Sequence, residues 1–206
     1  MNYLSFHNQF ASQDVVSTNE IQKAFPQFDT RRLVEWQQKG YIERLANRWY
    51  RFRKPIVDEQ MLWWAANRIY QPSYVSLETA LSHYGLIPEG VFSITSVSTR
   101  KTQTLTTPLG TFTYRSIKPA LYFGYDILRW QDRPVLMANV EKVLLDVCYL
   151  RPELQSEADF DALRLNVPML ISQLNKDRLA DYQQLVNSSR LNQRICLLLD
   201  YLQNHA

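Results

Sequence analysis

Apolar side chains recur at helical spacing near the start of the chain. Phe6 and Phe10 lie four residues apart and fit one face of a first helix. Ser17 and Glu20 match a capping box, in which each side chain accepts a hydrogen bond from the other residue's backbone N–H at a helix start. Pro26 ends this second helix, because proline cannot continue one. The opening of the chain therefore predicts two short helices.

A third helix is predicted between Asp29 and Gly40. Asp29 is a favourable N-cap residue, and Gly40 stands where a glycine commonly ends a helix. Leu33 and Trp36 have the spacing of an inner, buried face. The residues predicted to point outward are Thr30, Arg31, Arg32, Glu35 and Gln38.

Two runs rich in aromatic and β-branched residues follow, at 41–45 and 49–53. The segment between them is centred on Asn47, which tolerates the positive φ that a tight turn needs, so the runs predict a β-hairpin. Three helices followed by a hairpin is the order of a winged helix-turn-helix. We expect this domain to occupy residues 1–55.

The rest of the chain, residues 56–206, mixes helical and strand patterns. Ser76 is a predicted N-cap, Gly85 ends the same helix, and the Ser- and Thr-rich stretch up to Thr107 predicts a polar loop. The fold class expected is α+β, in which the N-terminal winged helix-turn-helix precedes a mixed α/β domain with a small antiparallel sheet and C-terminal helices. The predicted helices cover 59–70, 77–84, the segment from 135 to 150, 156–166, 168–186 and 188–203, and the predicted strands cover 91–98, 111–117 and 121–123.

Composition indicates a folded protein. Of 206 residues, 46% are hydrophobic and 21% are charged, which excludes a disordered chain. No apolar run reaches the roughly 18 residues of a membrane span, and the first residues lack a signal-peptide pattern. Cys148 and Cys196 cannot form a disulfide framework, and both are predicted to be inert thiols on apolar helix faces. We therefore expect a cytoplasmic protein with no membrane partner.

Charge is distributed unevenly along the chain. Residues 1–55 carry nine basic and five acidic side chains, whereas residues 56–206 carry fourteen basic and fifteen acidic ones. The segment 44–54 holds five basic residues and no acidic one. This asymmetry indicates either a polyanionic partner for the first segment or a solvated basic surface.

No catalytic constellation is evident in the sequence. The three histidines, at 7, 83 and 205, have no Cys or carboxylate at metal-ligand spacing, and no nucleotide-binding or hydrolase motif occurs. A nuclease-like cluster of Asp126, Asp132 and the Glu141–Lys142 pair is the one enzyme hypothesis, although such a pair is more typical of a structural or surface ion pair. We expect a protein that is not an enzyme and has no cofactor and no metal site.

The charge and the helix order together indicate binding to double-stranded DNA. The second helix of a helix-turn-helix enters the major groove, where arginine pairs with guanine and glutamine with adenine. Basic residues of the hairpin then reach phosphates or the adjacent minor groove. Two alternatives stay open: the arginines are ordinary helix formers, or the winged helix is a protein-interaction module. The candidate DNA-binding residues are Thr30, Arg31, Arg32, Glu35, Gln38, Lys39, Arg44, Asn47, Arg48, Arg51 and Arg53.

Three motifs in the middle of the chain occur in the order found in one bacterial family. They are the stretch YVSLETALSHYGLIPE at 74–89, the pair SITSVS at 93–98 with GTFTY at 110–114, and ANVEKVLLD at 138–146. Together with the predicted winged helix, they resemble AbiEi-type antitoxins, the transcriptional regulators of abortive-infection toxin–antitoxin systems. The resemblance covers about residues 1–150, and the last 55 or so residues match no family. The hairpin tip lacks the glycine common in relatives, and Val140 replaces a proline.

The resemblance implies a function as well as a fold. It implies a non-catalytic repressor whose N-terminal domain binds its own promoter and whose C-terminal domain counters a cognate nucleotidyltransferase-like toxin. Self-association on DNA is also expected, since winged helices often bind repeated half-sites. The alternative function is that of a protein-interaction adaptor which does not bind DNA.

Overall fold

The computed structural model describes residues 2–53 and 57–205. The first of these segments folds into a small unit with a three-stranded antiparallel sheet ordered β1-β3-β2. The predicted domain boundary between residues 55 and 56 lies outside the described residues and stays a prediction. The elements of the N-terminal unit are α1 (Tyr3–Phe10), the 3-10 turn η1 (Ala11–Gln13), β1 (Val15–Ser17), α2 (Thr18–Ala24), α3 (Arg31–Gln38), β2 (Ile42–Ala46) and β3 (Trp49–Phe52).

The N-terminal unit has its own hydrophobic core, built mainly from aromatic rings. Phe6 on α1 packs against Trp36 on α3 at 4.7 Å and against Phe52 on β3 at 5.4 Å between ring centroids. The predicted capping box of Ser17 and Glu20 is present at the start of α2. Strand β1 was not predicted from the sequence, because a three-residue strand produces no alternation to detect.

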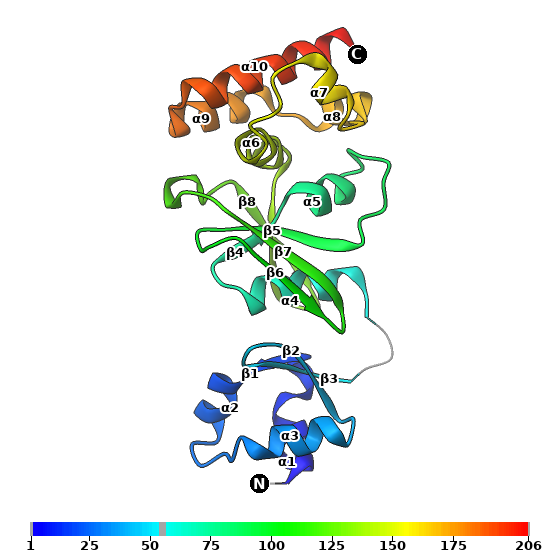
Figure 1. Ribbon diagram of the computed structural model, residues 1–206, viewed down its shortest axis with the longest axis vertical. Helices are drawn as coiled ribbons and strands as arrows, with labels where there is room; N and C mark the ends of the chain where they lie inside the picture. Colours follow the sequence, from blue (N-terminus) through cyan, green and yellow to red (C-terminus); the bar gives the residue numbers. More distant parts are fainter. Residues whose placement is uncertain (1, 54–56, 206) are drawn as a thin grey trace.

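The second segment is built on a six-stranded mixed sheet ordered β6-β7-β5-β4-β9-β8. The pairs β5–β7 and β4–β9 are parallel, so the predicted small antiparallel sheet is wrong in both size and type. Helix α4 covers one face of the sheet, and α5 and α6 cover the other (Figure 1). The elements are α4 (Glu59–Ile69), β4 (Ser73–Val75), α5 (Leu77–His83), β5 (Ser93–Ser98), β6 (Gln103–Thr107), β7 (Gly110–Ser116), η2 (Pro119–Leu121), β8 (Tyr125–Trp130), β9 (Arg133–Ala138) and α6 (Val140–Leu150).

Several expected elements differ in the structure. The polar stretch ending at Thr107 forms the edge strand β6 instead of a loop, and residues 119–121 form a 3-10 turn where a strand was expected at 121–123. Residues 135–138 belong to β9, so the helix expected from Val135 begins at Val140. The conformation of these segments is decided by contacts with neighbouring strands and turns, which the spacing of their own apolar residues does not reveal.

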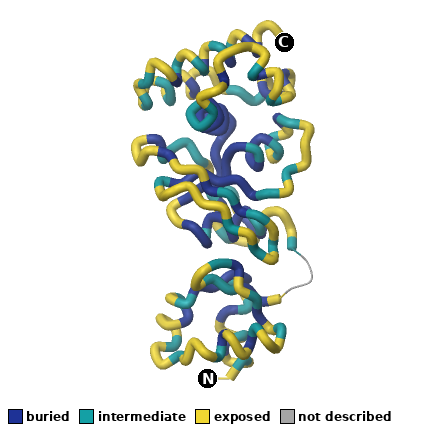
Figure 2. Tube along the Cα trace, in the orientation of Figure 1, coloured by how far each residue is buried: buried dark blue, intermediate teal, exposed yellow. Residues whose placement is uncertain are grey.

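Four C-terminal helices form a further layer on the outer side of α6 (Figure 1). The helix expected over 168–186 is two helices, because Asn175 caps a new one by accepting a hydrogen bond from the backbone N–H of Arg178. Buried residues concentrate in the sheet and in α6, as Figure 2 shows. The helices are α7 (Glu157–Asp161), α8 (Val167–Gln173), α9 (Lys176–Val186) and α10 (Ser189–Asn204).

Within the described residues, no helix has the length and apolar character needed to cross a bilayer.

Candidate nucleic-acid interface

Helix α3 begins with a different cap from the one predicted. Thr30 occupies the N-cap position in a helical conformation and makes no side-chain capping bond. The Asp29 carboxylate instead accepts hydrogen bonds from the backbone N–H of Arg31 at 3.0 Å and from its Nε at 3.1 Å. The Thr30 hydroxyl is therefore not used for capping at the N-terminal end of the helix, where base edges would be contacted.

The outward face of α3 is polar with one apolar position. Leu33 and Trp36 are buried, as predicted, whereas Arg31, Glu35 and Gln38 are exposed. Arg32 is half-buried beside them. The same face also carries Val34, which is 55% exposed and was not identified from the sequence. An exposed valine among polar groups has the chemistry to contact a thymine methyl group.

Charges on this face form local ion pairs. Arg31 Nη2 lies 2.9 Å from the Asp29 carboxylate, and Lys39 Nζ lies 2.6 Å from Glu35. Hydrogen bonds from Arg31 lower the pKa of Asp29, and the hydrogen bond from Lys39 lowers the pKa of Glu35. Because the Arg31 side chain is 90% exposed, its pair is weak and is open to exchange for a phosphate or base partner.

The hairpin between β2 and β3 presents two exposed arginines at its tip. Arg44 donates from Nε to the carbonyl of Ala46 and from Nη2 to the Asn47 side chain, both at 3.2 Å. The positive φ of the turn falls on Arg48, at 65°, and not on Asn47 as predicted. Arg48, Asn47 and Arg44 are all exposed, so the tip retains the chemistry expected of a phosphate-binding loop.

Arg51 does not lie on the exposed surface, which corrects its place among the candidate DNA-binding residues. Its side chain is 8% exposed and is ion-paired with Glu43 on the neighbouring strand β2. This pairing follows from the register, in which Glu43 and Arg51 are direct cross-strand neighbours. Arg51 therefore stabilises the hairpin, whereas Arg53, which directly follows β3, is exposed.

The N-terminal unit contacts the second unit through its sheet and not through α3. Val15 and Leu45 are buried in the larger hydrophobic core, and Arg133 Nη1 lies 2.7 Å from Asp14 across the contact. Arg68 of α4 is paired with Glu20 and stacks over the Trp49 ring at 5.2 Å. Helix α3 lies on the side facing away from α4, at the end of the molecule opposite α7–α10 (Figure 1). Its outer face is therefore uncovered.

The Glu141–Lys142 pair is neither a surface pair nor part of an acidic cluster. Both side chains are buried, and they bind different partners. Lys142 is ion-paired with Asp146 one turn along α6, and Glu141 accepts a hydrogen bond from the backbone N–H of Asn175 at 2.7 Å. Among the residues the structure describes, no group of three His, Cys, Asp or Glu side chains is placed to hold a metal ion.

Asp146 is the centre of a buried polar network. Besides Lys142, it accepts hydrogen bonds from the hydroxyl groups of Tyr74 and Ser76, each at 2.9 Å. Ser76 occupies the predicted N-cap position of α5, but its side chain binds Asp146 and makes no capping bond. Burial raises the pKa of Asp146 and lowers that of Lys142. Residues from the sequence motifs at 74–89 and 138–146 thus meet in a structural cluster.

A second cation-rich surface lies on the larger, second unit. Residues 90–125 contain no acidic side chain, and their four basic side chains are all exposed. They gather where β5 and β7 end, since Ser98 pairs with Ser116 and the Ser116 N–H donates to the Thr102 hydroxyl. The absence of acidic residues from 90–125 is the sequence signal by which this surface could have been predicted. The four cations are Arg100, Lys101, Arg115 and Lys118.

Comparison with known proteins adds no relative: no protein-family model matches the chain, and no curated protein matches it.

Proposed function

We propose that the chain is a sequence-specific DNA-binding repressor whose N-terminal unit is a winged helix-turn-helix. The order helix, strand, helix, helix, strand, strand with a β1-β3-β2 sheet supports this assignment. The observation that carries the proposal is the exposure of Arg31, Glu35 and Gln38 on α3, a helix that lies on the side of the N-terminal unit facing away from α4 (Figure 1).

In this proposal, α3 enters the major groove of B-DNA. Arg31 and Arg32 pair with guanine, Gln38 pairs with adenine, and Val34 contacts a thymine methyl group. Lys39, Arg44, Arg48 and Arg53 contact phosphates and hold the helix in register. The interface is completed by the neutral groups Thr30 and Asn47 and by Glu35, which accepts a hydrogen bond from cytosine.

We further propose that the protein is the antitoxin of a cytoplasmic toxin–antitoxin pair and represses its own promoter. The motifs at 74–89 and 138–146 support this proposal through their resemblance to AbiEi-type antitoxins. The second unit would then counter a nucleotidyltransferase-like toxin, and the protein would self-associate on repeated half-sites. Growth rescue on co-expression with the product of a neighbouring nucleotidyltransferase reading frame tests this part of the proposal.

The adaptor function remains the alternative, and direct binding separates the two. Fluorescence anisotropy is measured with a duplex from directly upstream of the gene and with a shuffled duplex of equal composition. We expect the wild-type protein to prefer the upstream duplex, and we expect Arg31→Ala/Arg32→Ala to weaken that complex by about 1–3 kcal/mol for each arginine–guanine pairing that is removed.

The matched control replaces two exposed arginines of the second unit, as Arg129→Ala/Arg190→Ala. We expect this variant to keep the preference for the upstream duplex. Unchanged affinity in the Arg31→Ala/Arg32→Ala variant contradicts the assignment of α3. Absence of binding to either duplex at low salt favours the adaptor.

A further inference from the structure

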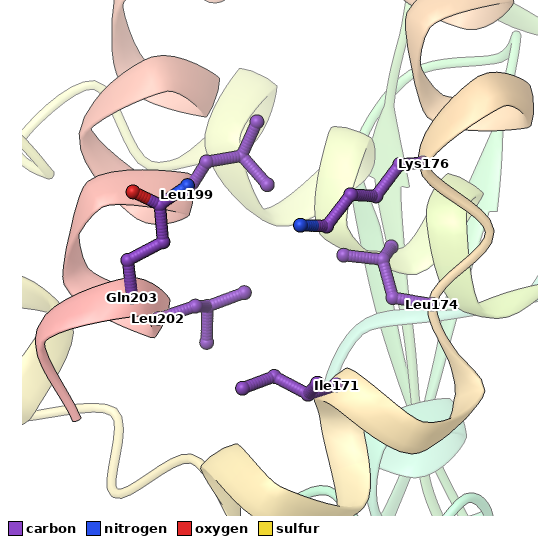
Figure 3. A pocket seen from close by; sticks show the side chains of 6 residues that line it. All are labelled: Ile171, Leu174, Lys176, Leu199, Leu202 and Gln203. Atoms are coloured by element: carbon purple, nitrogen blue, oxygen red, sulfur yellow. The ribbon is translucent and has the colours of Figure 1, made fainter. Parts of the chain in front are cut away.

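The C-terminal helices enclose a cavity of about 270 Å³ that opens to solvent. It lies between α8, the first turn of α9 and the last turns of α10 (Figure 3). We propose that this cavity binds a small aliphatic carboxylate, with the chain in the cavity and the carboxylate at its polar side. This binding is independent of the proposed DNA contact. The lining residues are Ile171, Leu174, Lys176, Leu199, Leu202 and Gln203.

The body of the cavity is made of branched aliphatic side chains. Leu199 and Leu202 enter it from α10, and Ile171 and Leu174 enter it from α8 and the residue that ends α8 (Figure 3). Ile171 is 41% exposed at the rim, whereas Leu202 is buried. Covering these side chains with hydrocarbon removes apolar surface from water, which favours an aliphatic ligand.

One side of the cavity is polar and positively charged. The Lys176 side chain extends into the cavity from α9, and the Gln203 amide lies near its edge on α10 (Figure 3). Lys176 makes no ion pair with another described residue, and the nearest acidic residues in sequence, Asp177 and Asp181, do not line the cavity. An unpaired ammonium group beside an apolar space is complementary to a ligand with one negative end and one hydrocarbon end.

The volume sets the size of the ligand. An apolar cavity of about 150 Å³ is sufficient for benzene, so 270 Å³ accommodates a chain of about six to eight carbons. A partner protein inserting one apolar side chain is the competing occupant, and it predicts no binding of a free carboxylate.

Isothermal titration calorimetry of the full chain with butanoate, hexanoate and octanoate tests the proposal. We expect saturable binding that tightens by about fourfold for each added methylene, because each one buries further apolar surface. Octanol, which has the same chain without the charge, is expected to bind about fivefold more weakly than octanoate. No saturable heat with octanoate at about 10 mM, the weak end of specific affinity, overturns the proposal.

Variants locate the site. Lys176→Met is expected to weaken octanoate about fivefold and leave octanol unchanged, and Ile171→Trp is expected to fill the rim and weaken both ligands. The control Lys118→Met removes an exposed ammonium far along the chain and is expected to change neither affinity. Equal octanoate affinity in the wild type, Lys176→Met and Ile171→Trp contradicts the assignment. All three variants alter residues with exposed side chains, so circular dichroism is sufficient to check their folding.

Discussion

Lys142 forms a buried ion pair that could be recognised only from the folded structure. Its ammonium group is fully buried, paired with Asp146 and placed over the ring of Phe123 at 5.1 Å. On an amphipathic helix, a Glu–Lys pair is usually solvent-exposed, and the sequence left open whether this pair was structural or on the surface. Burial of α6 between the sheet and the C-terminal helices makes both residues structural.

Removing one member of this buried pair is expected to destabilise the protein strongly. Lys142→Met leaves the Asp146 carboxylate buried without its counter-charge, which costs about 3–5 kcal/mol in the free energy of unfolding. Urea denaturation measures this loss, with Lys118→Met as the exposed-lysine control at less than about 0.5 kcal/mol. A loss for Lys142→Met no larger than the control's would show that the pair does not stabilise the fold.

The two cysteines are expected to differ in reactivity. Both were predicted to be buried, but only Cys148 is, and Cys196 is exposed on α10. Burial raises the pKa of the Cys148 thiol to about 12, so almost no thiolate forms at neutral pH. A disulfide reagent such as DTNB is expected to label one thiol in the native protein and two after unfolding. Rapid labelling of two native thiols contradicts the buried position of Cys148.

At the scale of elements, local signals predicted the presence of helices better than the presence of strands. The capping box at Ser17 and the ends of α4 were available from a few neighbouring residues. Strands β8 and β9 were missed because their stability comes from pairing with each other and, for β9, with the distant β4. The candidate surface of α3 was predictable from helical spacing, whereas the burial of Arg51 required the strand register.

The start of α2 is expected to make stability depend on pH. Burial alone would raise the pKa of Glu20. The pKa is nevertheless lowered, because the carboxylate accepts hydrogen bonds from Ser17 and pairs with Arg68. A lowered pKa in the folded state stabilises the protein above the ordinary value of 4.5, and this stabilisation is lost as the pH falls through the lowered value.

We therefore expect Glu20→Gln to cost about 1 kcal/mol at pH 7 and progressively less below pH 4.5. Urea denaturation at several pH values measures the difference from the wild type. The control Glu153→Gln alters an exposed glutamate and is expected to change little at any pH. A Glu20→Gln cost that stays constant from pH 7 to pH 3 contradicts the role of the charge.

At the scale of the whole molecule, α3 lies away from the second unit, whereas the hairpin belongs to the sheet that packs against it. Helix α3 lies at one end of the molecule, while the small sheet packs against the second unit (Figure 1). The exposed tip residues Arg44 and Arg48, which are proposed to contact phosphates, therefore belong to a hairpin that is held in place. Burial of Val15 and Leu45 in the larger core fixes the hairpin relative to the second unit.

The salt dependence of DNA affinity tests the proposed phosphate contacts of the tip. With Arg44→Gln/Arg48→Gln, the slope of log affinity against log salt is expected to become shallower by about 0.9 for each phosphate that is no longer neutralised. Affinity for upstream and shuffled duplexes is expected to fall alike, because phosphate contacts carry no sequence information. The control Arg129→Gln/Arg190→Gln should leave the slope unchanged. A slope equal to that of the wild type in the tip variant would place the tip off the DNA.

The most direct test of DNA recognition by α3 is protection of guanine N7 from dimethyl sulfate on the upstream duplex. N7 lies in the major groove, and Arg31 and Arg32 are proposed to bind it. We predict a short run of protected guanines with the wild-type protein and loss of that protection with Arg31→Ala/Arg32→Ala at a concentration that restores binding. A bound wild-type complex in which every guanine N7 stays reactive would contradict entry of α3 into the major groove.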